Sequence, residues 1–319
     1  MRITIVLSGL LALPAEALAT HRVLGRIAGT SRATIEPDLA QALLADVALG
    51  AAEAPLAALG AGLDVGARWV LRADPVRIVV GVQDARLEAR VDDLDAGECA
   101  ALKSLLDGHF AVDGLVFHAP RADAWFVMSD EPHAIDTSPL PRLIGAPLRG
   151  HLPTGRDGAK WRTWLTEAQM LLHDGPLARR EPPVNALWFS GGGTLPDASV
   201  VARIAAFADD DRHGDLVRGV ARIRGQQARS AASWGTALDA SFEMVIVAPS
   251  TIATLQDLDA LLDAFVAPAL DALDRRRASV VKLIADGDGI AASWRVEHTS
   301  WLQQWLRPRA RFTMPPADR

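Results

Sequence analysis

The chain has 319 residues, half of them hydrophobic, and a formal net charge of −6 at neutral pH. This composition supports a large buried core and lacks the basic balance that nucleic-acid-binding proteins usually show. The single cysteine, Cys99, excludes an intrachain disulfide, and no apolar run is long enough to span a bilayer. We therefore expect neither a nucleic-acid nor a membrane partner.

The first nineteen residues allow two interpretations. A basic start, an apolar stretch over residues 3–13 and a small-residue stretch over 17–19 are typical of a signal peptide, which would make the protein secreted. Gly9 and Pro14 interrupt that stretch, however, and the β-branched residues before Gly9 favour a buried strand over residues 3–8. We expect the strand, and with it a cytoplasmic protein.

Strands and helices then alternate along the chain. Asp95 and Glu98 form a capping-box pattern that predicts the start of a helix, and Pro268 predicts a kink in a long helix. Asp197 is expected to cap another helix, whose apolar face would include Ile204 and Phe207. Hydrophobic periodicity predicts further helices over 36–47, 161–172 and 257–277, strands over 76–80, 115–118, 124–128, 184–189, 244–247 and 280–285, and a long loop over 129–160.

This order of elements predicts an α/β fold. Strands separated by helices at both ends of the chain favour a mostly parallel sheet with helices on both faces. The hairpin-rich middle favours an inserted α+β unit. We expect residues 1–72 and 194–319 to form a discontinuous core domain, with residues 73–193 inserted between its two parts.

A glycine-rich segment, residues 190–193, follows the strand expected at 184–189. Between a strand and a helix, such a segment can present backbone N–H groups to an anion. No lysine follows the glycines, so the segment is not a P-loop. A tight turn with close backbone packing is the other interpretation, and the residues alone favour it.

The loop over residues 130–136 carries His133 and Asp136 beside two further acidic residues. A histidine and an aspartate three positions apart can bind a phosphate or a hard divalent ion. No standard zinc spacing accompanies them. An ordinary polar loop is therefore the favoured alternative.

Two more acidic segments, residues 209–215 and 286–289, follow expected elements. Carboxylates at the C-terminal end of a strand often contact ligands in α/β folds. A solvated turn at the first segment and an Asp-Gly turn at the second are the alternatives that the residues favour. The sequence contains neither a Gly-x-Ser-x-Gly elbow nor a His-Glu-x-x-His motif, so the residues alone give no complete catalytic set.

The order of these segments resembles the cofactor-independent phosphoglycerate mutases of the alkaline phosphatase superfamily, especially their archaeal-type branch. Residues 184–193 are similar to the family's Ala-Asn-x-Ile-Trp-Leu-Trp-Gly-x-Gly segment, and residues 132–136 to its Pro-His-Asp-Ile segment. Residues 173–180 are similar to a stretch that the family carries between them. The resemblance covers nearly the whole chain and implies a reduced alkaline phosphatase-like fold.

The departures from the family concern its metal ligands. The family's first strand ends in a metal-binding Asp, and Ser8 stands there in this chain. Residues 245–251 carry neither the Asp nor the His of the family's later strand, and Asp286 alone remains of an Asp-His pair. Because the family's phosphoryl transfer needs two metal ions, the resemblance implies a protein that has lost its catalytic site.

A closer similarity links the chain to bacterial proteins labelled RpfE-type regulatory proteins. It rests on the turn at residues 7–10, on residues 69–76, which begin with Trp69 and end in Asp74-Pro75-Val76, and on the strands at 112–115 and 124–126. It also rests on Trp301 and Trp305 with the arginines that follow them. The label implies a regulatory role and no particular activity.

From this resemblance we expect a non-catalytic regulatory or ligand-binding protein without a cofactor. The candidates for contacting a small phosphorylated metabolite are His133, Asp136, Arg179, Arg180, Asn185, Trp188, Gly191, Gly192 and Gly193.

Two alternatives remain open. The first is an active metal-dependent mutase or phosphatase, in which Asp286, Asp288 and His133 form a rearranged Mn or Zn site. The second is an interaction module that docks a protein partner through residues 301–311.

Overall fold

A computed structural model describes residues 1–47, 51–81, 84–197, 204–239, 242–298 and 311–313. The chain divides into one unit of Met1–Gly50 with Asp197–Arg319 and a second unit of Ala51–Pro196. The expected boundary at 72/73 falls inside a strand of the second unit, so the second unit begins earlier than we expected. The reason is that helix α4 (Glu53–Gly60) packs on strands β3 (Trp69–Val80) and β7 (Ala186–Gly193) of that unit.

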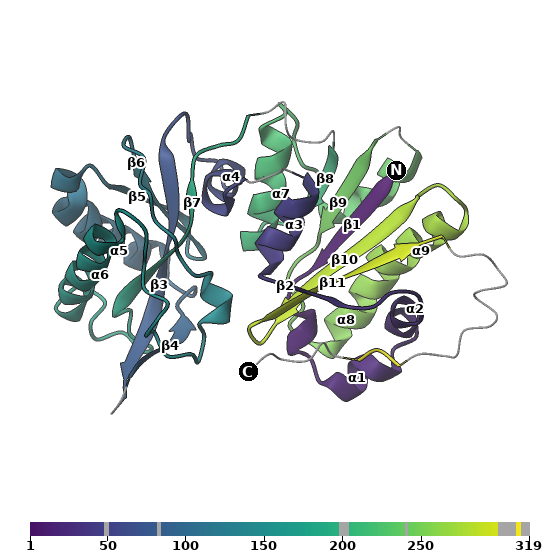
Figure 1. Ribbon diagram of the computed structural model, residues 1–319, viewed down its shortest axis with the longest axis horizontal. Coiled ribbons are helices and arrows are strands. Elements are labelled where there is room, and N and C mark those ends of the chain that lie inside the picture. The colour runs from purple at the N-terminus through teal and green to yellow at the C-terminus, as the bar shows by residue number, and fades with distance from the viewer. Residues whose placement is uncertain (48–50, 82–83, 198–203, 240–241, 299–310, 314–319) are drawn as a thin grey trace. The chain divides into compact units, whose positions relative to one another are not determined.

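The first unit is built on a six-stranded sheet with the order β2-β11-β10-β1-β9-β8 (Figure 1). Four neighbouring strands, β10, β1, β9 and β8, are parallel, and β11 and β2 extend the sheet by antiparallel pairing. The mostly parallel sheet is therefore confirmed. Its strands are β1 (Arg2–Leu7), β2 (Thr34–Glu36), β8 (Ile204–Ala208), β9 (Met244–Ala248), β10 (Val280–Gly287) and β11 (Ile290–Glu297).

Helices cover both faces of this sheet, as the alternating side chains of β1 require. Ile3, Ile5 and Leu7 belong to a core that includes Leu24 of α2 and Leu270 of α9. Helices α3 and α7 contact the sheet and each other (Figure 1). The helices of this unit are α1 (Ala15–Thr20), α2 (Arg22–Thr30), α3 (Leu39–Val47), α7 (Arg212–Arg222), α8 (Leu255–Leu261) and α9 (Ala267–Asp274), with short turns η1 (Leu10–Ala12) and η5 (Ala231–Asp239).

One predicted helix is wrong. Residues Ile204 and Phe207, expected on the apolar face of a helix capped by Asp197, lie in β8, which pairs in parallel with β9. All five residues of β8 are buried. A short, continuous apolar run fits a buried strand as well as a helix, so periodicity could not distinguish the two. The rest of that predicted face, Val200 and Val201, lies outside the described residues.

The expected long helix is interrupted. Helices α8 and α9 are joined by a π-helical segment, η6 (Leu262–Val266), directly before Pro268 at the start of α9. Proline has no N–H to donate to the carbonyl four residues earlier, which is that of Ala264. The indole Nε1 of Trp234 donates to this carbonyl instead, at 2.9 Å. A π-helical segment thus lies just before the position where a kink was expected, and the Trp234 indole hydrogen-bonds to the carbonyl that Pro268 cannot reach.

The second unit holds an antiparallel sheet. Strand β3 pairs with β4 (Ala85–Arg90), β6 (Ala124–Ser129) and β7, and β6 pairs with β5 (Val116–Arg121). The hairpin β5–β6 confirms the two strands expected there, whereas β4 was not expected. Helices α5 (Ala96–Phe110) and α6 (Gly158–His173) complete the unit with α4, the turn η2 (Ala111–Asp113) and the turn η3 (Leu140–Arg142).

Local signals in this unit are confirmed where they involve near neighbours. Asp95 accepts a hydrogen bond from the Glu98 N–H, and Glu98 accepts one from the Asp95 N–H, so the capping box that opens α5 is complete. Among the described helices, none is long and apolar enough to cross a membrane. Residues 301–310, expected to dock a partner, lie outside the described part of the chain.

Candidate functional site

The carboxyl ends of the parallel strands in the first unit carry several polar residues. In open α/β sheets, ligands bind outside this edge, where the strand order reverses. Ser8 follows β1, Asp209 follows β8, Ser250 lies two residues beyond β9, and Asp286 lies near the end of β10. These four polar residues therefore stand in a row along the edge.

Asp286 is held by the loop after β1. Its Oδ1 accepts a hydrogen bond from the backbone N–H of Gly9 at 3.0 Å. Gly9 has φ 81°, and a Cβ there would lie 2.3 Å from the carbonyl oxygen of Ile252. The Ile252 N–H in turn donates to the Ser8 carbonyl at 2.8 Å. The Asp286 carboxylate thus stabilises the loop after β1 where this loop contacts the loop that contains Ile252.

Asp209 has a similar role at the other side of the edge. Its Oδ2 accepts hydrogen bonds from both the N–H and the hydroxyl of Ser250 at 3.0 Å, and its Oδ1 accepts one from the Ala231 N–H at 3.3 Å. Three donors on two other segments therefore converge on this carboxylate. Asp209 joins the ends of β8 and β9 to η5.

The rest of the acidic segment also has structural partners. Asp211 caps α7 by accepting from the Gly214 N–H at 2.7 Å. The fully buried Asp215 pairs with Arg218 at 2.6 Å, and Arg218 also pairs with Asp210 at 3.0 Å. The acidic segment 209–215 follows strand β8 and not the helix that we had expected. Its acidic side chains cap α7 and form ion pairs within the β8–α7 connection.

The rearranged metal site that we considered draws its three residues from both units. Asp288 is exposed at φ 49° and is followed by Gly289 at φ 76°, which makes the two the turn of the β10–β11 hairpin. His133 belongs to the second unit, whereas Asp286 and Asp288 belong to the first. Across the ranges that the structure describes, no three His, Cys, Asp or Glu side chains gather so that they could hold a metal ion.

The glycine-rich segment is part of a strand. Gly191, Gly192 and Gly193 end β7, which pairs with β3. A Cβ on Gly192 would lie 2.6 Å from a ring carbon of Trp69, and one on Gly193 would lie 2.5 Å from the Cβ of Ala52. The glycines therefore serve close packing, and the interpretation as an anion-binding loop is corrected.

Asn185 and Trp188 also use their polar groups within the fold. The amide of Asn185 makes two hydrogen bonds with the backbone of Ile78, accepting from its N–H and donating to its carbonyl, both at 2.8 Å. Trp188 is buried and its Nε1 donates to the Ser138 carbonyl at 2.9 Å. Both side chains therefore hydrogen-bond to the backbone of their own unit.

The two neighbouring arginines, Arg179 and Arg180, differ in their contacts and in their exposure. The guanidinium of Arg180 pairs with Asp93 at 2.7 Å and with Glu98 at 3.1 Å, and it donates to the carbonyl of Pro182 at 2.9 Å. It therefore ties the segment after α6 to the start of α5. Arg179 is exposed, and no ion pair joins it to the described residues.

His133 lies in an aromatic cluster. Its ring centroid is 4.9 Å from Trp69, 5.3 Å from Trp161 and 5.9 Å from Trp164, each in an edge-to-face arrangement. Its Nε2 is 3.2 Å from the hydroxyl of Ser129.

The surroundings disfavour a charged imidazole at His133. Burial, and secondly the charge of Lys160, lower the pKa of His133, while Asp157 and Glu131 oppose this shift. Asp136 is exposed, and its backbone pairs with Thr154. The His133 side chain is thus packed against aromatic rings, and its neutral imidazole form is favoured at physiological pH.

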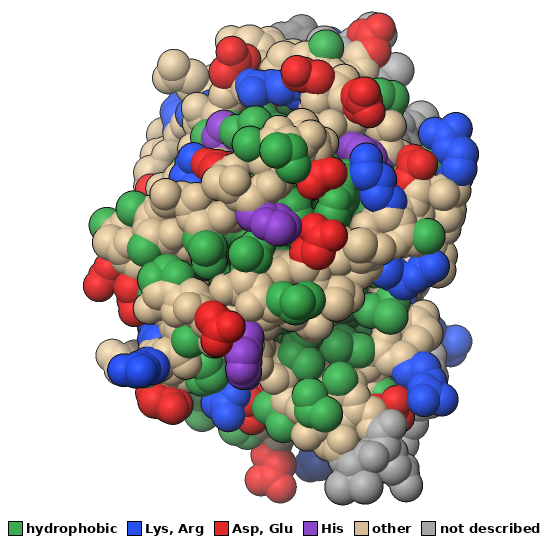
Figure 2. Space-filling model, turned by 90° about the vertical axis from the view of Figure 1, so that its left-hand side faces the viewer, with side chains coloured by type: hydrophobic (Ala, Val, Ile, Leu, Met, Phe, Trp, Pro, Cys, Tyr) green, Lys and Arg blue, Asp and Glu red, His purple; other side chains and the backbone are tan. Residues whose placement is uncertain are grey.

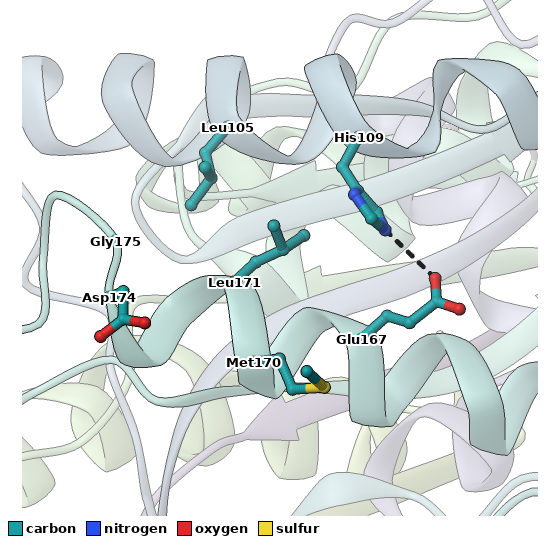
Figure 3. Close-up of a pocket in the computed structure, with 7 residues that line it drawn as sticks. All are labelled: Leu105, His109, Glu167, Met170, Leu171, Asp174 and Gly175. Atoms are coloured by element: carbon teal, nitrogen blue, oxygen red, sulfur yellow. Dashed lines mark hydrogen bonds and ion pairs between the residues drawn. The ribbon is translucent and has the colours of Figure 1, made fainter.

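Sequence reasoning missed a cavity in the second unit. It has a volume of about 420 Å³ and lies between α5 and α6 (Figure 3). Its lining is mainly apolar, with an ion pair between His109 and Glu167 at 3.2 Å. The signal was available, because three of its residues on α6 and the C-cap residue of that helix follow helical spacing. The lining residues are Leu105, His109, Glu167, Met170, Leu171, Asp174 and Gly175.

Comparisons with known proteins give structural neighbours. No protein-family model and no curated protein matches the sequence. The structure is similar to a cofactor-independent phosphoglycerate mutase from Thermoplasma acidophilum, with 17% identity, a TM-score of 0.43, and coverage of 96% of this chain and 94% of that chain. It is also similar to the PH0037 protein from Pyrococcus horikoshii, with 16% identity, a TM-score of 0.47, and coverage of 93% of this chain and 87% of that one.

Proposed function

We propose that this protein is a non-catalytic regulatory protein that acts by binding. The observation that carries the proposal is the state of the carboxylates at the carboxyl edge of the parallel sheet. Asp286 accepts from the Gly9 amide, and Asp209 accepts three hydrogen bonds from neighbouring loops. Both acids stabilise loop crossings.

Metal-assisted phosphoryl transfer has different requirements. Metal ions that activate a nucleophile and neutralise phosphate charge need several carboxylate and imidazole ligands converging from strand ends. The end of β1 carries the hydroxyl of Ser8 instead of a carboxylate. Asp209 and Asp286 instead accept hydrogen bonds from their neighbouring loops.

A small phosphorylated metabolite is a second candidate for what the protein binds. The N-terminus of α7 and the hydroxyl of Ser8 lie at the edge where α/β folds bind ligands, and both favour an anion. The acidic segment around Asp209 opposes one by charge repulsion. Raising the melting temperature with millimolar 3-phosphoglycerate would support this candidate, and no shift would count against it.

The test of the main proposal combines metal content with turnover. Protein purified without chelator or affinity metal is analysed by elemental mass spectrometry and assayed as a phosphoglycerate mutase with added Mn²⁺. An active mutase in the same buffer is the control. We expect no stoichiometric metal and no turnover. Turnover that requires Mn²⁺ and disappears in Asp286→Asn would overturn the proposal in favour of an active metal-dependent enzyme.

A further inference from the structure

The cavity between α5 and α6 has a regular lining. Glu167, Met170, Leu171 and Asp174 stand at positions i, i+3, i+4 and i+7 of α6 and its C-cap, so they share one helix face. Leu105 and His109 stand at i and i+4 of α5. Figure 3 shows Leu105 and Leu171 between the His109–Glu167 pair and Asp174. The cavity is therefore a groove with an apolar middle and an acid at each end.

The apolar side chains of this groove differ in exposure, and Leu105 and Leu171 also pack against the core of the unit. Met170 is 69% exposed, and Leu105 and Leu171 are half-buried. The face shown in Figure 2 carries hydrophobic side chains among acidic ones, on the side where Figure 1 draws α5 and α6. Exposed methionine is frequent on surfaces that bind helices, because its flexible thioether adapts to different partners.

The charges define what can lie in the groove. Asp174 is exposed and makes no ion pair with any described residue, while Glu167 pairs only with His109 among them. The two acids are seven residues apart, which is about 10 Å along a helix. A second helix lying in the groove would meet both acids with basic residues that are also seven positions apart.

We propose that this groove binds an amphipathic helix of a partner protein, with Lys or Arg at positions i and i+7 and apolar residues at i+3 and i+4. Helix-in-groove recognition uses this anchor pattern. An open groove without a buried polar group suits a helix better than a small metabolite, which is usually enclosed and oriented by buried polar groups. The inference rests on the proposed function, since it names the surface and partner class through which a binding protein would act.

The probe is a set of labelled fifteen-residue peptides, and binding is followed by fluorescence anisotropy. The basic peptide has Lys at positions 4 and 11, Leu at 7 and 8, and Ala or Gln elsewhere. One matched peptide has Glu in place of both Lys, and another keeps both Lys residues but separates them by five positions. We expect saturable binding of the basic peptide. Binding of the Glu peptide, which loses both surface ion pairs, should be about tenfold weaker, and binding of the peptide with re-spaced lysines, which loses one pair, about threefold weaker.

Protein variants test the site. The double variant Glu167→Lys/Asp174→Lys should bind the basic peptide about tenfold more weakly than the wild type does. It should bind the Glu peptide more tightly than the basic peptide. Asp130→Lys with Glu131→Lys changes the net charge equally at exposed positions outside the groove, and should leave both affinities unchanged. Circular dichroism melting confirms that each variant folds.

Three results would overturn the inference: no saturation of the wild type by the basic peptide at millimolar concentration, equal binding of the basic and Glu peptides, or equal effects of the two double variants. None of these results changes the expected metal content or mutase assay. Failure of the groove and failure of the proposed function are therefore distinguishable.

Discussion

The carboxylate of Asp286 and the backbone N–H of Gly9 are separated by 277 positions in the sequence and form a 3.0 Å hydrogen bond. The bond joins the ends of two adjacent parallel strands, β10 and β1. A carboxylate at this position could equally have been a metal ligand. In this structure the carboxylate hydrogen-bonds to the backbone and stabilises the turn after β1. A substitution of Asp286 should therefore change the stability of the protein.

Replacing Asp286 by Ala should lower the free energy of unfolding by about 1–2 kcal/mol, because a partly buried hydrogen bond to a charged group is lost. Urea denaturation measures the change. Asp288→Asn is the control, since Asn tolerates the left-handed backbone of the hairpin turn and should change stability by less than about 0.5 kcal/mol. Equal effects of the two substitutions would contradict the role of the Gly9 contact.

Replacing Gly192 by Ala should destabilise the second unit. The new Cβ would lie 2.6 Å from a ring carbon of Trp69 and 2.7 Å from a methyl of Leu71, so the expected cost is about 1–3 kcal/mol of overpacking. Gly108→Ala on α5 is the matched control, because its Cβ meets nothing within 4 Å and alanine favours a helix. An anion-binding role would instead leave the stability of Gly192→Ala near that of the wild type.

The adjacent arginines offer a direct comparison. Arg180→Ala removes ion pairs to Asp93 and Glu98 and leaves carbonyls without their donor, so we expect a loss of about 1–2 kcal/mol in unfolding free energy. Arg179→Ala, at an exposed position, should stay within about 0.5 kcal/mol of the wild type. Chemical denaturation of both variants checks this, and a larger effect at Arg179 would be inconsistent with the observed contacts.

Protonation of His133 should couple stability to pH. Burial holds its folded-state pKa below the ordinary value of 6.5, so the unfolded chain binds the proton more tightly than the folded one. The contribution of neutral His133 is therefore fully present above about pH 7 and decreases as the pH falls below 6.5. His118, whose pKa is also lowered, first by burial and then by Lys103, acts in the same direction.

The measurement is the unfolding free energy from pH 8 to pH 5. His133→Gln should show a shallower decrease than the wild type, while His173→Gln, exposed at the end of α6, should follow the wild-type curve. A decrease as steep in His133→Gln as in the wild type would mean that other groups govern the acid sensitivity.

The sequence by itself determined the elements that depend on near neighbours. The capping box of Asp95 and Glu98 involves residues three apart, and the alternation of Ile3, Ile5 and Leu7 marks a strand wherever it packs. The Asp288-Gly289 turn follows in the same way from the left-handed backbone that these residues tolerate.

Only the tertiary structure decided what the chemistry-bearing residues do. Ile204 and Phe207 form a strand because β9 lies beside them, and the glycines after Ser190 end a strand because Trp69 and Ala52 approach them closely. Asp209 and Asp286 hold loops because their amide partners come from distant segments. A residue type states which bonds a side chain can make, whereas long-range packing selects the partner, and for these residues the partner is the protein's own backbone.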